Sequence, residues 1–452
     1  MTNLNSTQPR SKENWNSRIG FVLAAAGSAV GLGNLWGFAY RSSQGGGAVF
    51  LLLYVLIVLL VCIPVLVAEM VLGRSTGSSP FLAPLNLGGR VWQPMGVVFV
   101  IASCGILSFY AILMGWTADT FFHSLFFGLP ENIQEAKSFI SSVSTGSSVF
   151  LGQLLSLLLT GIVVAGGIKG GIEKLARWSM PFLFGLVIIL AVWSATLPGA
   201  WDGYQDFLLK WDFSQLLNPT TIRNAFAQAF FSLSLGIGIM VAYSSYLNKK
   251  NQLPKESLVI AGLDTSVGIL AGMVTFPIIA TFPQVQEAVG DSFISTLFVA
   301  LPTGLSSLGF TGQIITILFF ALAFIAALTS SISLLEVPVS SLIDRFGLNR
   351  NKAVILSTIF VFLLGIPPAL SEEVFGNYSN IMDVLLLLGG FLISILLGWF
   401  VTRKYDEDLA NSYTNINVRR YLRFMLRWIS PTAISFGLLI TLYDLLGLKE
   451  IL

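Results

Sequence analysis

Apolar residues occur in long runs along the chain instead of in the alternating pattern of soluble helices and strands. Eleven runs reach about 20 residues, the length an α-helix needs to cross a bilayer. They are predicted at residues 18–41, 48–72, 93–125, 150–168, 174–197, 222–248, 256–282, 306–342, 353–370, 380–401 and 427–447. The third and eighth runs exceed this length, so we expect them to tilt or to extend beyond the membrane. The pattern predicts an all-α polytopic membrane protein.

The first and sixth runs are interrupted near their middle by small and polar residues. The first contains GSAVGLGN at 27–34, and the sixth contains FSLSLGIG at 231–238. Glycine weakens a helix, and lipid cannot satisfy the backbone groups of an unwound turn. Close helix packing through Gly27 and Gly31 is the alternative, but it explains neither Asn34 nor the second interruption. We therefore predict two discontinuous helices that line a binding site.

The two interruptions lie five runs apart, and this spacing predicts two inverted five-helix repeats. Discontinuous helices 1 and 6 would open the repeats, with the binding site near the midplane. The halves do not visibly match in sequence, so the repeat rests on the interruptions alone. The predicted parts are an N-terminal segment 1–17, a core 18–401 with repeats at 18–197 and 222–401, a loop 402–426, and an additional helix with a short C-terminus at 427–452.

Composition and charge support this reading and set the orientation. Charged residues make up 11% of the chain, whereas soluble domains carry about twice that fraction. With the N-terminus in the cytoplasm, 20 of the 25 lysines and arginines fall on the cytoplasmic side, as the positive-inside rule requires. Loop 402–426 would then be cytoplasmic, and short helices are expected in the outer stretches 126–148, 198–221 and 283–305.

Other function classes lack support in the sequence. Cys62 and Cys104 lie inside apolar runs, which argues against a disulfide framework. The single histidine, His123, has no metal-ligand spacing around it, and no nucleophile–base set or phosphate loop suggests an enzyme. A net charge of +2 gives no reason to expect a nucleic-acid partner.

Polar residues at span depth indicate what the interruptions bind. They are Asn34, Glu69, Tyr110, Asp264 and the triplet 329–331. Half-helix N-termini suit a carboxylate, and unwound carbonyls suit an alkali cation. A zwitterionic amino acid with Na⁺ would use both kinds of group. We expect Glu69 to brace the interrupted sixth helix through backbone hydrogen bonds; the roles of Asp119 and Glu336 stay open.

The motif AVGLGNLW at 29–36, followed by GGGA at 45–48, resembles the neurotransmitter:sodium symporter family. The resemblance runs from about Lys12 to at least Asp383 and is closest to bacterial amino-acid transporters of the family. It implies the inverted-repeat fold, the inner (plasma) membrane of a bacterium, and two Na⁺ sites. The first site would use Ala29, Asn34, Ser232 and Asp264. The second would use Gly27, Val30, Ala326, Thr329 and Ser330.

The resemblance also implies a substrate pocket and its specificity. The carboxylate would meet the Gly31 and Gly33 N–H groups and the Tyr110 hydroxyl. Phe231 would cover the ligand. The full predicted set is Ala29, Gly31, Leu32, Gly33, Ile106, Tyr110, Phe231, Ser232, Ser234, Ile237, Ser330, Ser331 and Leu334. Because the side-chain part contains no acid or base, we expect an apolar L-amino acid.

Asp264 stands where animal members of the family carry asparagine and bind chloride nearby. The chloride positions would be Tyr54, Gln228, Ser232 and Gly268. A carboxylate at Asp264 supplies the negative charge, so the resemblance implies transport that does not need chloride. Protonation of Asp264 on the return path would add proton antiport.

The gates depart from the family pattern. At the cytoplasmic gate the family pairs an arginine with an aspartate; here Lys12 and Asp344 stand beside Trp15, with Tyr246 in support. At the extracellular gate Asp383 is retained, but Gly37 replaces the usual arginine. Arg41 lies about one turn further out, so either it substitutes or the ion-pair gate is missing; we favour the second. The pattern Gly171-x₉-Pro181 is associated in bacterial members with local unwinding of the fifth helix.

Together these observations predict a Na⁺-coupled symporter of apolar or aromatic L-amino acids that works by alternating access. One alternative is a symporter of the same fold for another small neutral amino acid or amine. The other is a ligand-binding sensor without turnover. The sequence leaves the oligomeric state and the preferred amino acid open.

Overall fold

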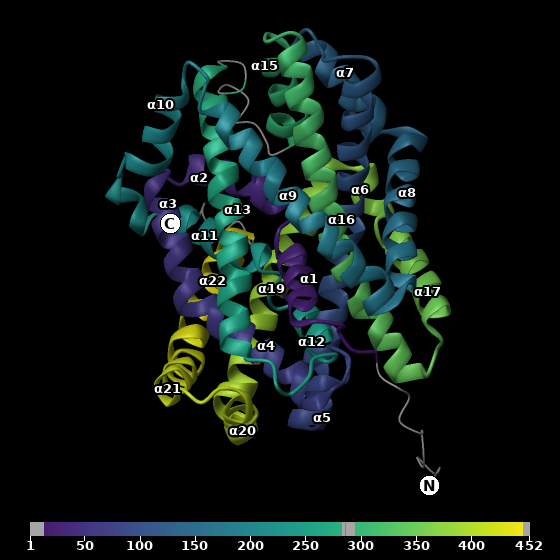
Figure 1. The fold of residues 1–452 in the computed structure, drawn as a ribbon, viewed down its shortest axis with the longest axis vertical. Helices are drawn as coiled ribbons and strands as arrows, with labels where there is room; N and C mark the ends of the chain where they lie inside the picture. The colour runs from purple at the N-terminus through teal and green to yellow at the C-terminus, as the bar shows by residue number, and fades with distance from the viewer. Residues whose placement is uncertain (1–12, 283–284, 286–293, 446–452) are drawn as a thin grey trace.

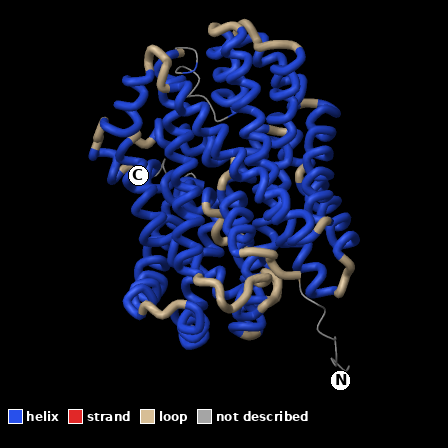
Figure 2. The backbone as a smooth tube through the Cα atoms, in the orientation of Figure 1, coloured by secondary structure: helices blue, strands red, loops and turns tan. Residues whose placement is uncertain are grey.

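The computed structural model describes residues 13–282, 285 and 294–445. Figure 2 shows that helices joined by short turns build this part of the chain. The described residues contain no strand, only an isolated bridge between Gly47 and Trp211. The all-α prediction is confirmed.

Eight uninterrupted helical stretches in the described part are long and apolar enough to cross a membrane. They are Ala48–Thr76, Arg90–Phe126, Gly146–Ala165, Ile168–Ser194, Leu253–Thr281, Phe310–Phe346, Glu372–Phe400 and Ile416–Tyr443. The predicted over-long third and eighth spans contain α6 (Gln93–Phe126) and α16 (Phe310–Phe346), with 34 and 37 residues. Figure 1 labels both in the right half of the view, and α16 packs against α6.

The three other predicted runs are interrupted or short. The first consists of α1 (Arg18–Ala29) and a segment Gly33–Gln44, which contains α2 (Phe38–Gln44) and bends from α1 by 63°. The sixth consists of α11 (Pro219–Ser232) and α12 (Ile239–Ser244). The ninth is α17 (Arg350–Leu364), followed by α18 (Ile366–Leu370). Both predicted discontinuous helices are therefore present.

The break between α11 and α12 needs glycine and an external brace. Ser234 and Gly236 have positive φ values of 53° and 78°, and a Cβ on Gly236 would lie 1.9 Å from the Leu386 carbonyl oxygen. The Gly236 N–H donates to Oε1 of the fully buried Glu69 at 2.6 Å. This bond satisfies a backbone group that the break leaves without a helical partner, and it confirms the predicted role of Glu69.

The remaining long helices surround these breaks. They are α3 (Ala48–Ile57), α4 (Ile63–Thr76), α8 (Gly146–Ala165), α9 (Glu173–Ser194), α13 (Leu253–Thr281), α19 (Glu372–Ile395) and α22 (Ser430–Leu445). Short helices cover the ends of the bundle at α5 (Ala83–Gly88), α7 (Ile133–Ser144), α10 (Ala200–Tyr204) and α15 (Leu301–Ser306). The last three lie in the stretches where the sequence predicted short helices.

Two further segments have a defined helical structure. The predicted loop 402–426 contains α20 (Thr402–Ser412) and α21 (Ile416–Phe424), and the Asn415 side chain caps α21. The fifth span is helical through both Gly171 and Pro181, so it shows no unwinding here. A Cβ on Gly171 would lie 1.9 Å from the Val163 carbonyl oxygen, so close packing accounts for this glycine.

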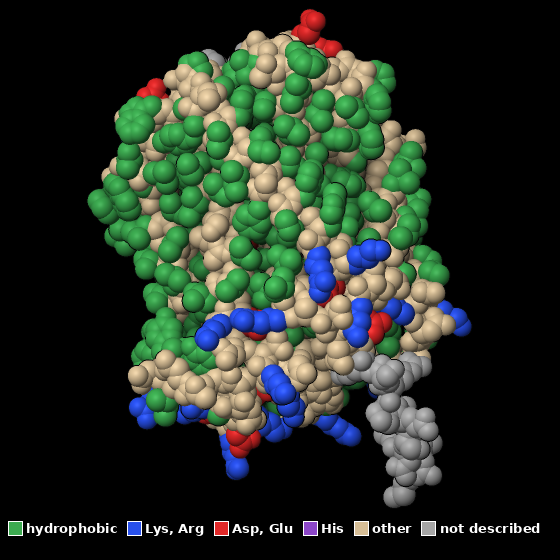
Figure 3. Space-filling model, in the orientation of Figure 1, with side chains coloured by type: hydrophobic (Ala, Val, Ile, Leu, Met, Phe, Trp, Pro, Cys, Tyr) green, Lys and Arg blue, Asp and Glu red, His purple; other side chains and the backbone are tan. Residues whose placement is uncertain are grey.

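The surface matches a membrane-spanning bundle. In Figure 3 hydrophobic side chains cover the middle and upper part of the visible face, while lysines and arginines gather at the end that carries α5, α20 and α21. We call this end the basic end. The helix breaks lie inside the bundle, away from both ends.

Candidate functional site

The two helix breaks line a small, nearly closed pocket with a free volume of about 20 Å³. Helices α6, α16 and α19 complete its wall. The lining residues are Ser28, Ala29, Gly31, Gly33, Asn34, Ile106, Tyr110, Phe231, Ser234, Ile237, Ser330, Leu334 and Leu386. The pocket therefore joins segments that lie far apart in the sequence at the place where both helices unwind.

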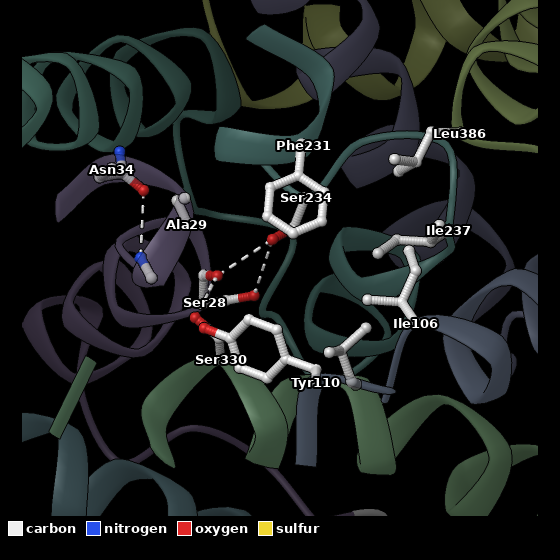
Figure 4. Close-up of a pocket in the computed structure, with 13 residues that line it drawn as sticks. Ser28, Ala29, Asn34, Ile106, Tyr110, Phe231, Ser234, Ile237, Ser330 and Leu386 are labelled. Carbon is white, nitrogen blue, oxygen red and sulfur yellow. Dashed lines mark hydrogen bonds between the residues drawn. The ribbon is translucent and has the colours of Figure 1, made fainter. Parts of the chain in front are cut away.

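The pocket has a polar side and an apolar side. In Figure 4, Ser28, Asn34 and Ser330 lie on one side, and Ile106, Ile237 and Leu386 lie on the other. The rings of Phe231 and Tyr110 lie between them. Such a division fits a ligand with one charged end and one apolar end.

Ten of the thirteen predicted substrate residues line this pocket, and three do not. Leu32 lines a neighbouring cavity, and its N–H donates to the Tyr110 hydroxyl at 3.1 Å. Ser232 binds Asp264 instead. Ser331 bonds to Leu328 of its own helix and to Thr160 of α8 at 2.8 Å, because it lies on the α8 side of α16.

Three lining residues were not predicted as substrate contacts: Asn34, predicted only as a Na⁺ ligand, and Ser28 and Leu386, which were predicted for no site. Ser28 belongs to the polar interruption itself, so the sequence offered a signal for it. Leu386 is one of four consecutive leucines at 385–388, and nothing in that run distinguishes the residue that faces a pocket.

A buried polar cluster adjoins the pocket at Asp264. The Asn34 amide donates to Oδ1 of Asp264 at 2.6 Å and to Oγ of Ser232 at 2.7 Å. Ser232 and Tyr54 donate to Oδ2 of Asp264 at 2.7 and 3.2 Å. The carboxylate is fully buried and has no cationic partner among these contacts. Three residues of the predicted first Na⁺ site thus lie within hydrogen-bond distance of one another, beside Ala29 in the pocket wall.

A second group of oxygen atoms lies between the end of α1 and α16. Ser330 donates to the carbonyl oxygens of Ser28 and Val30 at 3.2 and 3.4 Å. Thr329 donates to the Ala326 carbonyl oxygen at 3.0 Å, and a Cβ on Gly27 would lie 3.4 Å from Thr329 Cβ. The five residues of the predicted second Na⁺ site are therefore neighbours. Ser330 bonds across to the unwound turn and not back to its own helix.

The backbone between the two clusters is held by side chains. The Gly31 N–H donates to Oδ1 of Asn34 at 3.1 Å. A Cβ on Gly31 would lie 2.8 Å from both the Tyr110 hydroxyl and the Ser330 hydroxyl. A Cβ on Gly33 would lie 2.8 Å from the Phe231 ring. Only glycine lets this turn approach the pocket walls so closely.

Phe231 and Tyr110 separate the pocket from a larger cavity of about 490 Å³, because both residues line both spaces. Arg41 and Asp383 lie in the larger cavity, and their Nη2 and Oδ2 atoms are 3.8 Å apart. Arg41 also donates to Oε1 of Gln228 at 3.4 Å. Our preference for a missing ion pair is wrong. A helical side chain points back toward the N-terminus of its helix, so Arg41 extends over the turn that contains Gly37.

At the basic end Lys12 lies outside the described residues, and the predicted pair with Asp344 is not described. Asp344 accepts the Ser79 N–H at 2.7 Å. The Trp15 indole donates to the Tyr243 carbonyl oxygen at 2.8 Å, which ties the chain before α1 to α12.

An ion-pair network that sequence reasoning left unassigned lies in the same region. Glu336, fully buried, accepts the Tyr246 hydroxyl at 2.9 Å and lies 2.5 Å from Nη2 of Arg350. Nη1 of Arg350 lies 3.8 Å from Glu13, whose carboxylate also accepts the Ile168 N–H. This network connects the N-terminal segment to α16, to α17 and to Tyr246, which follows α12.

Comparisons with known proteins agree with this geometry. The model of the sodium:neurotransmitter symporter family matches residues 12–139 and 132–449. The chain is 34% identical to an uncharacterized sodium-dependent transporter of Bacillus subtilis, over 96% of this chain and 98% of that protein. It is 32% identical to one of Methanocaldococcus jannaschii, over 94% and 90%.

A solved structure shows the same architecture. The crystal structure of MhsT in complex with L-phenylalanine superimposes with a TM-score of 0.87 at 35% identity, and covers 95% of this chain and 100% of that chain.

Proposed function

The chain belongs to the sodium:neurotransmitter symporter family, and from this premise we propose that it imports apolar and aromatic L-amino acids together with Na⁺ by alternating access. As a member of this family it is a multi-pass, sodium-dependent transporter. The proposed substrate class and Na⁺ coupling rest on the pocket at the helix breaks, which has a polar and an apolar side. The buried Asp264 cluster lies beside the polar side. The basic end would face the cytoplasm.

We assign the amino acid to the pocket by its chemistry. Its ammonium and carboxylate groups would lie at the unwound turns, near Ser28 and Tyr110. Its side chain would contact Ile106, Ile237 and Leu386, which offer no charge or hydrogen-bond partner to a polar side chain. The similar MhsT structure contains L-phenylalanine, which supports an apolar substrate of this size.

We assign two Na⁺ ions to the two oxygen clusters. At the first, Asn34, Ser232 and Asp264 provide side-chain oxygens and Ala29 provides its carbonyl. At the second, Gly27, Val30 and Ala326 would provide carbonyls, with the hydroxyls of Thr329 and Ser330. All these ligands are hard oxygens, which suit an alkali cation. A substrate carboxylate shared with the first ion would couple the two solutes, because each completes the other's site.

A competition panel tests the substrate assignment. The twenty L-amino acids are added in excess to Na⁺-dependent uptake of labelled L-phenylalanine by proteoliposomes. We expect Leu, Ile, Val, Met, Phe, Tyr and Trp to compete and the charged amino acids and glycine to have little effect. Competition by glycine alone would support the alternative of a smaller solute. Saturable binding without uptake would support a sensor.

Chloride replacement gives a further prediction. Tyr54 and Ser232, two of the hydroxyls that the family offers to chloride, both donate to Asp264 here. Replacing chloride by gluconate at saturating Na⁺ should therefore leave the initial uptake rate unchanged. A rate that falls with chloride and recovers when it is restored would contradict the assignment of the fixed negative charge to Asp264.

The Arg41→Ala variant tests the relocated extracellular gate. Loss of the Arg41 contacts with Asp383 and Gln228 removes the charged link across the larger cavity. We expect an uptake rate lower by about three- to fivefold at equal expression, in line with about 1 kcal/mol for a partly exposed ion pair. The control is Lys210→Ala, which removes an exposed ion pair with Asp206. Equal rates in the two variants would show that Arg41 is not a gate residue.

A further inference from the structure

Two tryptophans and an arginine form a cluster where the ends of two spans meet near the basic end. The guanidinium of Arg427 lies 4.5 Å from the ring centroid of Trp399 and 5.6 Å from that of Trp428. The two indoles meet edge to face with centroids 4.7 Å apart. The Trp399 indole donates to the Arg427 carbonyl oxygen at 2.9 Å. These contacts fix the position of the guanidinium.

The guanidinium lacks an acceptor for one of its donors. Among the residues that the structure describes, Nε of Arg427 is buried and has no hydrogen-bond partner. Nearby arginines do have carboxylate partners: Arg423 donates to Asp406 at 2.8 Å, and Arg403 to Glu407 at 2.7 Å. Arg427 has no carboxylate partner in the described part and is partly exposed, and its planar guanidinium matches the geometry of a phosphate. The cluster therefore favours a phosphate from outside the chain.

The depth of the cluster points to the membrane surface. The apolar stretch Glu372–Phe400 ends beside it, and the charged helix α20 begins at Thr402. Trp399 and Trp428 are 41% and 49% exposed, and tryptophans at this level are typical of the membrane–water interface.

Further features of the surroundings fit a lipid. Phe400 and Phe424 are exposed beside the tryptophans and offer apolar surface to acyl chains. Arg419 lies two turns before Arg427 along the same continuous helix, and its Nε also lacks a partner in the described part. Basic residues next to a membrane span attract anionic lipids.

We propose that Arg427, held between Trp399 and Trp428, binds the phosphate of an anionic phospholipid in the leaflet at the basic end. The lipid would connect the end of the stretch Glu372–Phe400 to the stretch Ile416–Tyr443, which contains the additional helix outside the two repeats. The exposed aromatic side chains beside the cluster would contact its acyl chains. This binding site is separate from the transport pocket and does not depend on the identity of the transported solute.

Lipid-dependent stability tests the proposal on the full-length protein. Purified transporter is titrated with phosphatidylglycerol or with phosphatidylcholine, and its Tm and bound phospholipid are measured. We expect phosphatidylglycerol to raise Tm more than phosphatidylcholine does. The Arg427→Gln variant should bind phosphatidylglycerol about fivefold more weakly, the contribution of one basic residue at an anionic surface. Arg403→Gln, an exposed arginine paired with Glu407, is the matched control and should behave like the parent.

Two further variants keep the result interpretable if Arg427→Gln folds poorly. Arg427→Lys retains the charge but loses the planar donor fork, and Trp428→Leu removes one ring; both should weaken phosphatidylglycerol binding while Arg403→Gln does not. Equal stabilisation of the parent and all three cluster variants by phosphatidylglycerol would overturn the proposal. A second result would also overturn the proposal: the cluster variants change the oligomeric state of the protein but bind phosphatidylglycerol as the parent does. The cluster would then be a contact between copies of the chain.

Discussion

Replacing Asp264 by asparagine is expected to raise the Na⁺ concentration for half-maximal uptake by about tenfold or more. The carboxylate is the only formal charge in the cluster with Asn34, Ser232 and Tyr54, and it is fully buried. Asparagine keeps the volume but removes the charge that attracts a cation. Initial uptake rates measured across a Na⁺ titration check this expectation.

The matched control for Asp264→Asn is Asp119→Asn. Asp119 is a partly buried carboxylate on α6 that does not line the pocket. Its replacement should leave the Na⁺ titration unchanged. An Asp264→Asn protein with normal Tm and an unaltered Na⁺ titration would remove Asp264 from the Na⁺ site.

The second large effect is expected for Gly31→Ala. The added methyl group would lie 2.8 Å from the hydroxyls of Tyr110 and Ser330, inside the polar side of the pocket. Overpacking of this kind costs about 1–3 kcal/mol, or about five- to 150-fold in binding. We expect the KM for L-phenylalanine to rise by about tenfold or more, as measured by concentration-dependent uptake.

Gly185→Ala provides the control for Gly31→Ala. Gly185 lies in α9, and a Cβ there would meet nothing within 4 Å. This variant should transport like the parent protein. A Gly31→Ala variant with the parent KM would show that the amino acid does not approach this turn.

The sequence predicted the discontinuous helices because glycine and polar residues at bilayer depth conflict with a simple span. Asn34 and Asp264 could be chosen because polar side chains at bilayer depth are costly and usually functional, whereas their assignment together with Ser232 to one Na⁺ site came from the family resemblance. Ser331 was misplaced because neighbouring polar residues on a helix point to different faces, and the sequence alone does not show which face lines the pocket. Leu386 could not be found, since it is equivalent in sequence to its neighbours.

The extracellular gate illustrates a different limit. Gly37 shows that the usual arginine is absent, but the position of a replacement depends on side-chain direction and on the distance to Asp383. Arg41 reaches Asp383 because its side chain runs back along α2. Glu336 was undecided for a related reason: its partner Arg350 belongs to another helix, and sequence spacing does not reveal the contact.

Accumulation of an apolar amino acid against its gradient tests the central claim most directly. Purified protein in proteoliposomes is given labelled L-phenylalanine with an inward Na⁺ gradient, or with Na⁺ replaced by K⁺ at equal ionic strength. We predict that the internal concentration exceeds the external one only with the Na⁺ gradient, and that the Asp264→Asn protein accumulates far less under the same conditions. Equilibration without accumulation, or accumulation that is equal in Na⁺ and K⁺, would contradict Na⁺-coupled transport of this substrate class.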